Sequence, residues 1–195
     1  MVSTDRPGAQ PGPLVVLIGP PGSGKTSAAQ ALSTRLGVSW HDTDAAVEQA
    51  AGCTITEIFA DEGEAGFRAR ERAAVAHALA TETGVLSLGG GAVLDPGTQG
   101  RLAGRRVVFL DVGIADAAKR IGFDRSRPLL AVNPRGTWVN IMQARRPIYE
   151  GLAGLRVDTA GRTPDQVADV IAAWLRTERP ADPAAAAPGQ EGLDG

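Results

Sequence analysis

The chain has 195 residues, 43% of them hydrophobic, which is enough for the core of one domain. Its 20 Lys and Arg against 22 Asp and Glu leave a net charge of −2, so no global field favours nucleic acid or an anionic membrane. The single cysteine, Cys53, excludes an internal disulfide and a cysteine metal cluster. Because no apolar run suits a targeting segment or a membrane span, we expect a cytoplasmic monomer without nucleic-acid or membrane partners.

The first pattern in chain order is a phosphate-binding loop. Residues 1–13 are poor in side chains that could be buried, and we expect a disordered tail. An apolar strand over 14–18 then leads into Gly-x-x-x-x-Gly-Lys-Thr and a helix over 24–36. The glycines let successive backbone N–H groups point at phosphate oxygens, and the helix adds its positive dipole end. The nucleotide-binding residues expected here are Gly22, Ser23, Gly24, Lys25, Thr26 and Ser27, with Lys25 on the β- and γ-phosphates and Thr26 on Mg²⁺.

Two aspartates follow the second strand. A short strand over 38–41 ends in Asp42-Thr-Asp44, at the sheet edge where open α/β folds bind ligands. Residues two apart in an extended segment point the same way, so both carboxylates would enter one site. On the residues alone, a strand-end turn fits the pair equally well. We expect helices over 45–51, over 54–60 behind a Thr-x-x-Glu capping box, and over 64–81 with one polar face.

The second half of the chain continues the alternation of strands and helices. A strand over 85–88 runs into Gly89-Gly90-Gly91, which permits close backbone approach but also fits a flexible turn. A short helix over 97–103, a strand over 106–111 and a helix over 115–121 follow. Residues 122–136 contain three arginines among turn formers, and we expect a mobile lid.

The last elements complete one domain over 14–178. We expect a helix over 137–149 that Pro147 ends or kinks, a strand over 155–158, and a helix from Thr163-Pro164 to 176. The Pro- and Ala-rich residues 179–195 predict a second disordered tail. Strands separated by helices form a βαβ series, so the fold class is α/β with a parallel sheet covered on both faces.

Four further stretches narrow the family. They are Asp42-Thr-Asp44, Phe67-Arg68, Leu88-Gly-Gly-Gly91, and Arg127-Pro-Leu-Leu130 with Arg145-x-Pro-x-Tyr149. In this order and spacing, over residues 14–176, the set resembles shikimate kinase, a small P-loop kinase of chorismate and aromatic amino acid biosynthesis. The resemblance implies a three-layer P-loop kinase fold with five parallel strands in the order 2-3-1-4-5. It also implies phosphorylation of the shikimate 3-hydroxyl by ATP. The family usually has Lys-Ser-Thr where this chain has Lys25-Thr26-Ser27, and both orders keep a hydroxyl for the metal.

The resemblance also implies a role for each site residue. Lys25 and Arg127, the latter in the lid, share the charge of the γ-phosphoryl group, and Asp44 accepts the proton of the 3-hydroxyl. Guanidinium groups suit the shikimate carboxylate because they bind it bidentately. The resemblance implies that Thr26 and Asp42 hold Mg²⁺, and that Arg120, Arg127 and Arg162 bind ATP together with the phosphate-binding loop. The implied substrate-binding residues are Asp44, Arg68, Gly89, Gly90, Gly91 and Arg145.

Three questions stay open on the sequence. The acceptor could be another small hydroxylated acid, such as gluconate, which related kinases phosphorylate. The chain could also be a regulatory domain that binds nucleotide without catalysis, although its full set of acceptor-side residues argues against this. Finally, Arg146 could share the role of its neighbour Arg145.

Overall fold

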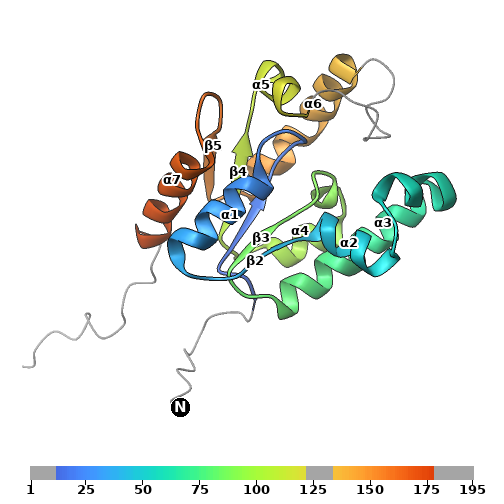
Figure 1. The fold of residues 1–195 in the computed structure, drawn as a ribbon, viewed down its shortest axis with the longest axis horizontal. Coiled ribbons are helices and arrows are strands. Elements are labelled where there is room, and N and C mark those ends of the chain that lie inside the picture. Colours follow the sequence, from blue (N-terminus) through green and yellow to red (C-terminus); the bar gives the residue numbers. More distant parts are fainter. Residues whose placement is uncertain (1–11, 122–133, 178–195) are drawn as a thin grey trace, which may run out of the picture.

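The structure is a computed structural model that describes residues 12–121 and 134–177. Most of the expected lid, including Arg127, and nearly all of both expected tails lie outside the described residues. The described strands form one five-stranded parallel sheet in the order β2-β3-β1-β4-β5 (Figure 1). This confirms the expected strand order. It also places β1, the strand before the phosphate-binding loop, at the centre of the sheet.

The element bounds follow the sequence pattern closely. The strands are β1 (Val15–Ile18), β2 (Trp40–Asp42), β3 (Val85–Ser87), β4 (Val107–Asp111) and β5 (Leu155–Asp158). The helices are α1 (Lys25–Leu36), α2 (Thr43–Ala51), α3 (Ile55–Thr81), α4 (Pro96–Leu102), α5 (Ile114–Ile121), α6 (Pro134–Leu152) and α7 (Pro164–Thr177), with a 3₁₀ turn, η1 (Ala92–Leu94), before α4.

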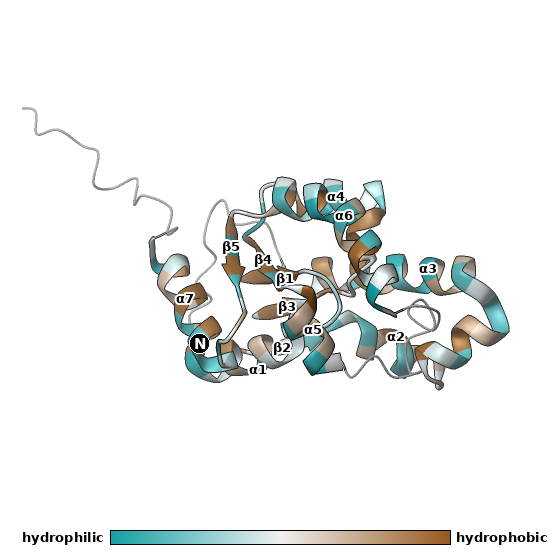
Figure 2. Cartoon of the chain, turned by 90° about the horizontal axis from the view of Figure 1, so that it is seen from above, coloured by the Kyte–Doolittle hydropathy of each residue, from teal (hydrophilic) through white to brown (hydrophobic). Residues whose placement is uncertain are grey.

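Alternation along β1 divides the core between the two faces of the sheet. Val15 and Leu17 pack with residues of α1 and α7 on one face. Val16 and Ile18 pack with residues of α3, α4 and α6 on the other face. All four side chains are buried, as suits a central parallel strand. Figure 2 shows the strands, coloured as hydrophobic, between helices that mix hydrophilic and hydrophobic residues.

The second strand and its helix begin at different residues from those expected. The strand begins at Trp40 rather than at residue 38 and includes Asp42. The helix begins at Thr43 rather than at residue 45 because Asp42 caps it: the Asp44 amide donates to Asp42 Oδ1 at 2.9 Å. Asp44 is therefore helical, and the prediction that Asp42 and Asp44 share one extended segment is wrong.

Helix α6 is longer than expected at both ends. It begins at Pro134, so the last three residues of the expected 122–136 lid are helical. It also continues through Pro147 to Leu152, whereas we expected Pro147 to kink or end it. Core contacts on both sides of the proline account for this, since Met142 and Tyr149 are both buried in the same cluster.

The two helices expected over 54–60 and 64–81 form one element, α3, that is interrupted at Gly63. The φ of Gly63 is 70°, outside the helical region. The predicted capping box is present: Thr54 and Glu57 satisfy each other's backbone N–H groups at the start of α3. In the described part of the chain, no helix combines the length and the apolar character needed to cross a bilayer.

Candidate active site

The phosphate-binding loop lies between β1 and α1. Gly22 and Gly24 have φ values of 81° and 83°, the left-handed region that favours glycine. The Lys25 ammonium folds over its own loop and donates to the carbonyls of Gly19 at 2.9 Å and Pro20 at 3.1 Å. Among the described residues, the buried Ser23 hydroxyl has no hydrogen-bond partner. A loop with an ammonium group and a buried polar atom of this kind suits a phosphate ligand.

The two residues expected to hold Mg²⁺ are in direct contact. The Thr26 hydroxyl, in the first turn of α1, donates to Asp42 Oδ2 at 2.8 Å. Both offer hard oxygen ligands, which Mg²⁺ prefers, and Mg²⁺ usually takes only one or two carboxylates besides waters and phosphates. Within the described ranges no group of three or more His, Cys, Asp or Glu side chains could hold a metal ion. The hydroxyl of Thr26 and the carboxylate of Asp42 suit a Mg²⁺ that takes its remaining ligands from phosphates and water.

Asp44 faces the glycine loop that follows β3. The Gly89 amide donates to the hydroxyl of Thr43 at 2.9 Å, which ties this loop to the start of α2. A Cβ atom on Gly89 would collide with Asp44 Oδ1 and lie 2.8 Å from Glu71 Oε1. The two carboxylates thus lie in neighbouring positions: Asp42 is beside the phosphate-binding loop, and Asp44 is beside the glycine loop.

Two arginines approach the same glycine loop from different helices. Arg68 of α3 lies so close that a Cβ atom on Gly91 would collide with its guanidinium. Its side chain is only 17% exposed and donates to Glu71 at 2.6 Å, so it is not an ordinary surface charge. Arg145 of α6 is buried and donates to the Gly90 carbonyl at 2.9 Å. The substrate-binding residues expected from the sequence are therefore brought together in space.

Two side chains that hold this arrangement in place had no role assigned from the sequence, although Tyr149 belongs to the Arg145-x-Pro-x-Tyr149 motif. Glu71 is 3% exposed and lies beneath Arg68, three residues further along α3. Tyr149 is fully buried, stacks on Phe109, and donates its hydroxyl proton to the Gly90 carbonyl at 2.6 Å. Burial raises the pKa of the Tyr149 phenol to about 12. The helical spacings of i, i+3 and i, i+4 were the available signal, because they place each residue on the same helix face as its arginine.

Of the two described residues expected around the nucleotide base, Arg120 contacts the phosphate-binding loop directly. Arg120 of α5 donates to the Gly22 carbonyl at 3.2 Å and to the Thr159 hydroxyl at 2.9 Å. Arg162 lies exposed in the turn after β5, and its amide also donates to Thr159. The structure thus brings Arg120 to the loop and links Arg162 to it through Thr159.

Comparison with known proteins identifies the family. A family model described as shikimate kinase matches residues 21–176. A shikimate kinase of Salinispora arenicola is 56% identical over 163 residues, which cover 84% of this chain and 98% of that protein. One of Thermobifida fusca is 53% identical over 163 residues, covering 84% and 95%. The chain belongs to the shikimate kinase family.

A solved structure agrees with this assignment to the shikimate kinase family. Shikimate kinase from Acinetobacter baumannii in complex with shikimate matches with a TM-score of 0.83 at 30% identity, covering 88% of this chain and 96% of that one. The family and fold expected from the sequence are confirmed. As a member of the shikimate kinase family the chain is an ATP-dependent kinase, so the alternative of a binding domain without catalysis is not supported.

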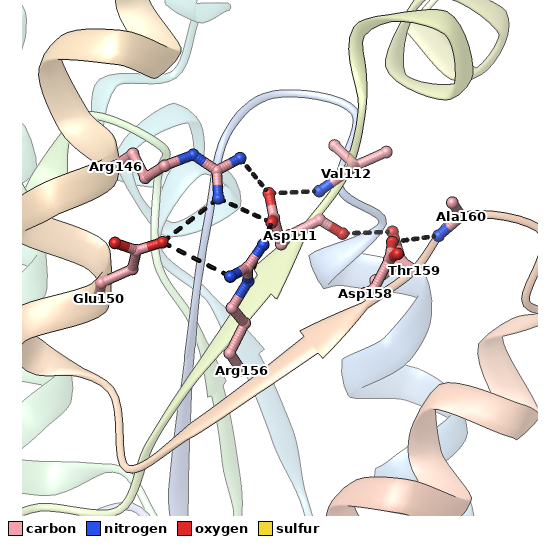
Figure 3. Close-up of polar contacts among 8 residues, drawn as sticks. All are labelled: Asp111, Val112, Arg146, Glu150, Arg156, Asp158, Thr159 and Ala160. Atoms are coloured by element: carbon pink, nitrogen blue, oxygen red, sulfur yellow. Dashed lines mark hydrogen bonds and ion pairs between the residues drawn. The ribbon is translucent and has the colours of Figure 1, made fainter.

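Arg146 has a different environment from its neighbour Arg145. Its guanidinium donates two hydrogen bonds of 2.9 Å to Asp111, at the end of β4 (Figure 3). Burial pushes the pKa of the Asp111 carboxyl up, but hydrogen bonds from Arg146 and Arg156 outweigh this and hold it below its usual value. Arg146 therefore contacts the sheet, whereas Arg145 contacts the glycine loop.

Proposed function

We propose that the residues described above carry out the reaction of this chain, the transfer of the γ-phosphoryl group of ATP to the 3-hydroxyl of shikimate, and that Mg²⁺ assists. Family membership supports the reaction. The observation that carries the residue assignment is the convergence of Asp44, Arg68 and Arg145 on one glycine loop, next to the phosphate-binding loop. We also propose that the chain acts as a cytoplasmic monomer with these small molecules as its only substrates.

On the nucleotide side, Lys25 exchanges two backbone carbonyls for the β- and γ-phosphates. Its ammonium already lies over the loop that would hold them. The amides of residues 22–27 surround the phosphates, and Arg120 and Arg162 lie toward the base. Arg127, outside the described residues, adds a second cation to the γ-phosphoryl group. Phosphoryl transfer depends mainly on such positioning and charge neutralisation.

Thr26 and Asp42 are the residues that would hold Mg²⁺. A bound Mg²⁺ would neutralise phosphate charge and fix the orientation of the phosphates. Before it binds, the hydrogen bond between the two side chains keeps both oxygens at the same end of α1. The assignment therefore needs little rearrangement of the protein.

On the acceptor side, two guanidinium groups and a carboxylate define the orientation of shikimate. Arg68 and Arg145 bind the shikimate carboxylate, for which the planar fork of a guanidinium is well suited. Asp44 accepts hydrogen bonds from the ring hydroxyls. The lack of side chains at Gly89 and Gly91 leaves the space that the ring requires, since a Cβ at either position would meet one of these groups.

The chemical step is an in-line displacement at the γ-phosphorus. The oxygen of the 3-hydroxyl forms a bond to phosphorus, and the bond from phosphorus to the β,γ-bridging oxygen breaks, so its electron pair leaves with ADP. Asp44 takes the hydroxyl proton as the new bond forms. The products are shikimate 3-phosphate and ADP.

The proposal is tested by a coupled ADP-release assay with a panel of hydroxylated acids. We expect turnover with shikimate and none above background with gluconate, and the reverse result would show that the acceptor is wrong. The variant Asp44→Asn should lose most of its kcat, because the carboxylate that accepts the proton is gone. Asp165→Asn is the matched control, since Asp165 also lies in the first turn of a helix, at α7. Equal activity of the two variants would contradict the role of Asp44.

A further inference from the structure

The carboxylate of Asp111 is a buried charged group that the proposed reaction does not use. Its side chain is 7% exposed at the end of β4. It accepts two hydrogen bonds from Arg146, two from Arg156 at 3.0 and 2.6 Å, and one from the Val112 amide at 2.9 Å (Figure 3). Five donors around one carboxylate hold it in a single orientation.

The groups around Asp111 balance in charge. Glu150, one turn after Arg146 on α6, lies 3.3 Å from the Arg146 guanidinium and 3.7 Å from that of Arg156. Two arginines thus meet two carboxylates, and no net positive charge remains to attract a phosphate or a substrate carboxylate. This arrangement suits a structural connection between α6, β4 and β5 rather than a ligand site. We call Asp111, Arg146, Glu150 and Arg156 the Asp111 cluster.

The Asp111 cluster lies next to an interruption in the backbone hydrogen bonding of α6. Pro147 follows Arg146 directly; it has no N–H to donate within the helix, and its ring crowds the carbonyl four residues earlier. The backbone around Arg145 and Arg146 therefore lacks part of its normal helical restraint. Successive residues of a helix point about 100° apart, so fixing the direction of Arg146 also fixes that of Arg145.

We propose that Asp111, acting through Arg146, is a positioning residue that holds Arg145 against the glycine loop and so sets the affinity for shikimate. The proposal rests on the proposed role of Arg145 toward the shikimate carboxylate. Neither Asp111 nor Arg146 touches a substrate in this account. Their effect reaches the site through the orientation of α6, while the phosphate-binding loop keeps its own contacts.

The test is a double-mutant cycle with Arg145→Lys and Arg146→Gln. Arg146 is 35% exposed, so the glutamine variant should fold. Arg146→Gln should raise the KM for shikimate about five- to tenfold and change kcat and the KM for ATP less than about twofold. In the Arg145→Lys background the same substitution should change the KM for shikimate by less than about twofold, because groups that act as one unit are not additive. Asp111→Asn, if it folds, should reproduce Arg146→Gln and add nothing to it.

Arg35→Gln is the matched control, because Arg35, in the last turn of α1, is a similarly exposed arginine that pairs with Asp169 of α7. It should leave the KM for shikimate unchanged. A lower melting temperature of Arg146→Gln with an unaltered KM for shikimate would overturn the proposal, as would additive effects of the two substitutions. If instead Arg145→Lys alone leaves the KM for shikimate unchanged, the assignment of Arg145 under the proposed function fails, which is a separate result.

Discussion

The proposed nucleotide side and the proposed acceptor side of this site are built in different ways. The nucleotide side depends mainly on one short stretch, residues 19–27, whose backbone and Lys25 form a local structure. The acceptor side takes Asp44 from α2, Arg68 from α3, Gly89–Gly91 from the loop after β3 and Arg145 from α6. Substitutions on the first side should disturb one local structure, whereas those on the second can also act through the neighbouring elements that they contact.

Removal of the nucleotide-side cation should have the largest effect. Lys25→Ala deletes the ammonium that would stabilise charge on the γ-phosphoryl group, and we expect kcat/KM to fall by about 10³-fold or more. Steady-state assays measure this directly. Lys119→Ala is the control, because Lys119 is the only other lysine and is exposed on α5. Equal activities of the two variants would show that the loop does not act as proposed.

A single methyl group on the glycine loop should damage the acceptor side selectively. In Gly89→Ala the new Cβ would collide with Asp44 and crowd Glu71. We expect the KM for shikimate to rise by about tenfold or more, with a much smaller change in the KM for ATP. Gly100→Ala, in α4, adds the same methyl where no atom lies within 4 Å, and it should be neutral. A comparable rise for both substrates would mean that the two sides are not separable in this way.

Loss of the Tyr149 hydroxyl, which donates to the Gly90 carbonyl, should weaken shikimate binding by a smaller factor. Tyr149→Phe keeps the stacked ring but leaves the Gly90 carbonyl with Arg145 as its side-chain donor. The loss of one buried hydrogen bond, about 1 kcal/mol, corresponds to roughly a fivefold weaker affinity for shikimate if it is felt fully at the site. Calorimetric titration with shikimate checks this. An unchanged affinity together with a lower melting temperature would make Tyr149 purely structural.

The ionisation of Tyr149 probes the hydrogen bond from its hydroxyl to the Gly90 carbonyl without any substitution. It is the only tyrosine, so the absorbance of tyrosinate reports on this residue alone. The phenol should titrate at about 12 in the folded protein and near 10 in denaturant. Since its pKa is higher in the folded state, its contribution to stability is complete below about pH 10 and is lost as the pH rises through about 12. Titration near 10 in the folded protein would contradict the burial and the hydrogen bond.

The same contrast explains what the sequence could predict. Lys25 and Thr26 lie within one contiguous motif whose geometry is local, so their positions follow from residue order. For Asp44, pattern alone was misleading, because the cap made by Asp42 starts the helix two residues early. The partners of Arg145 and Arg146 depend on where α6 packs against the sheet, and the core on both sides of Pro147 decides this rather than local propensity. The pairing of Asp111 with Arg156 also depends on the register of β4 and β5.

We propose that shikimate binds between Asp44 and the two arginines, over the glycine loop. The sharpest test of this placement is a crystal structure with ADP, Mg²⁺ and shikimate. We expect the shikimate carboxylate within hydrogen-bond distance of Arg68 and Arg145, and a ring hydroxyl within hydrogen-bond distance of the Asp44 carboxylate. A bound shikimate whose nearest hydroxyl lies more than a water molecule's width from Asp44 would contradict it.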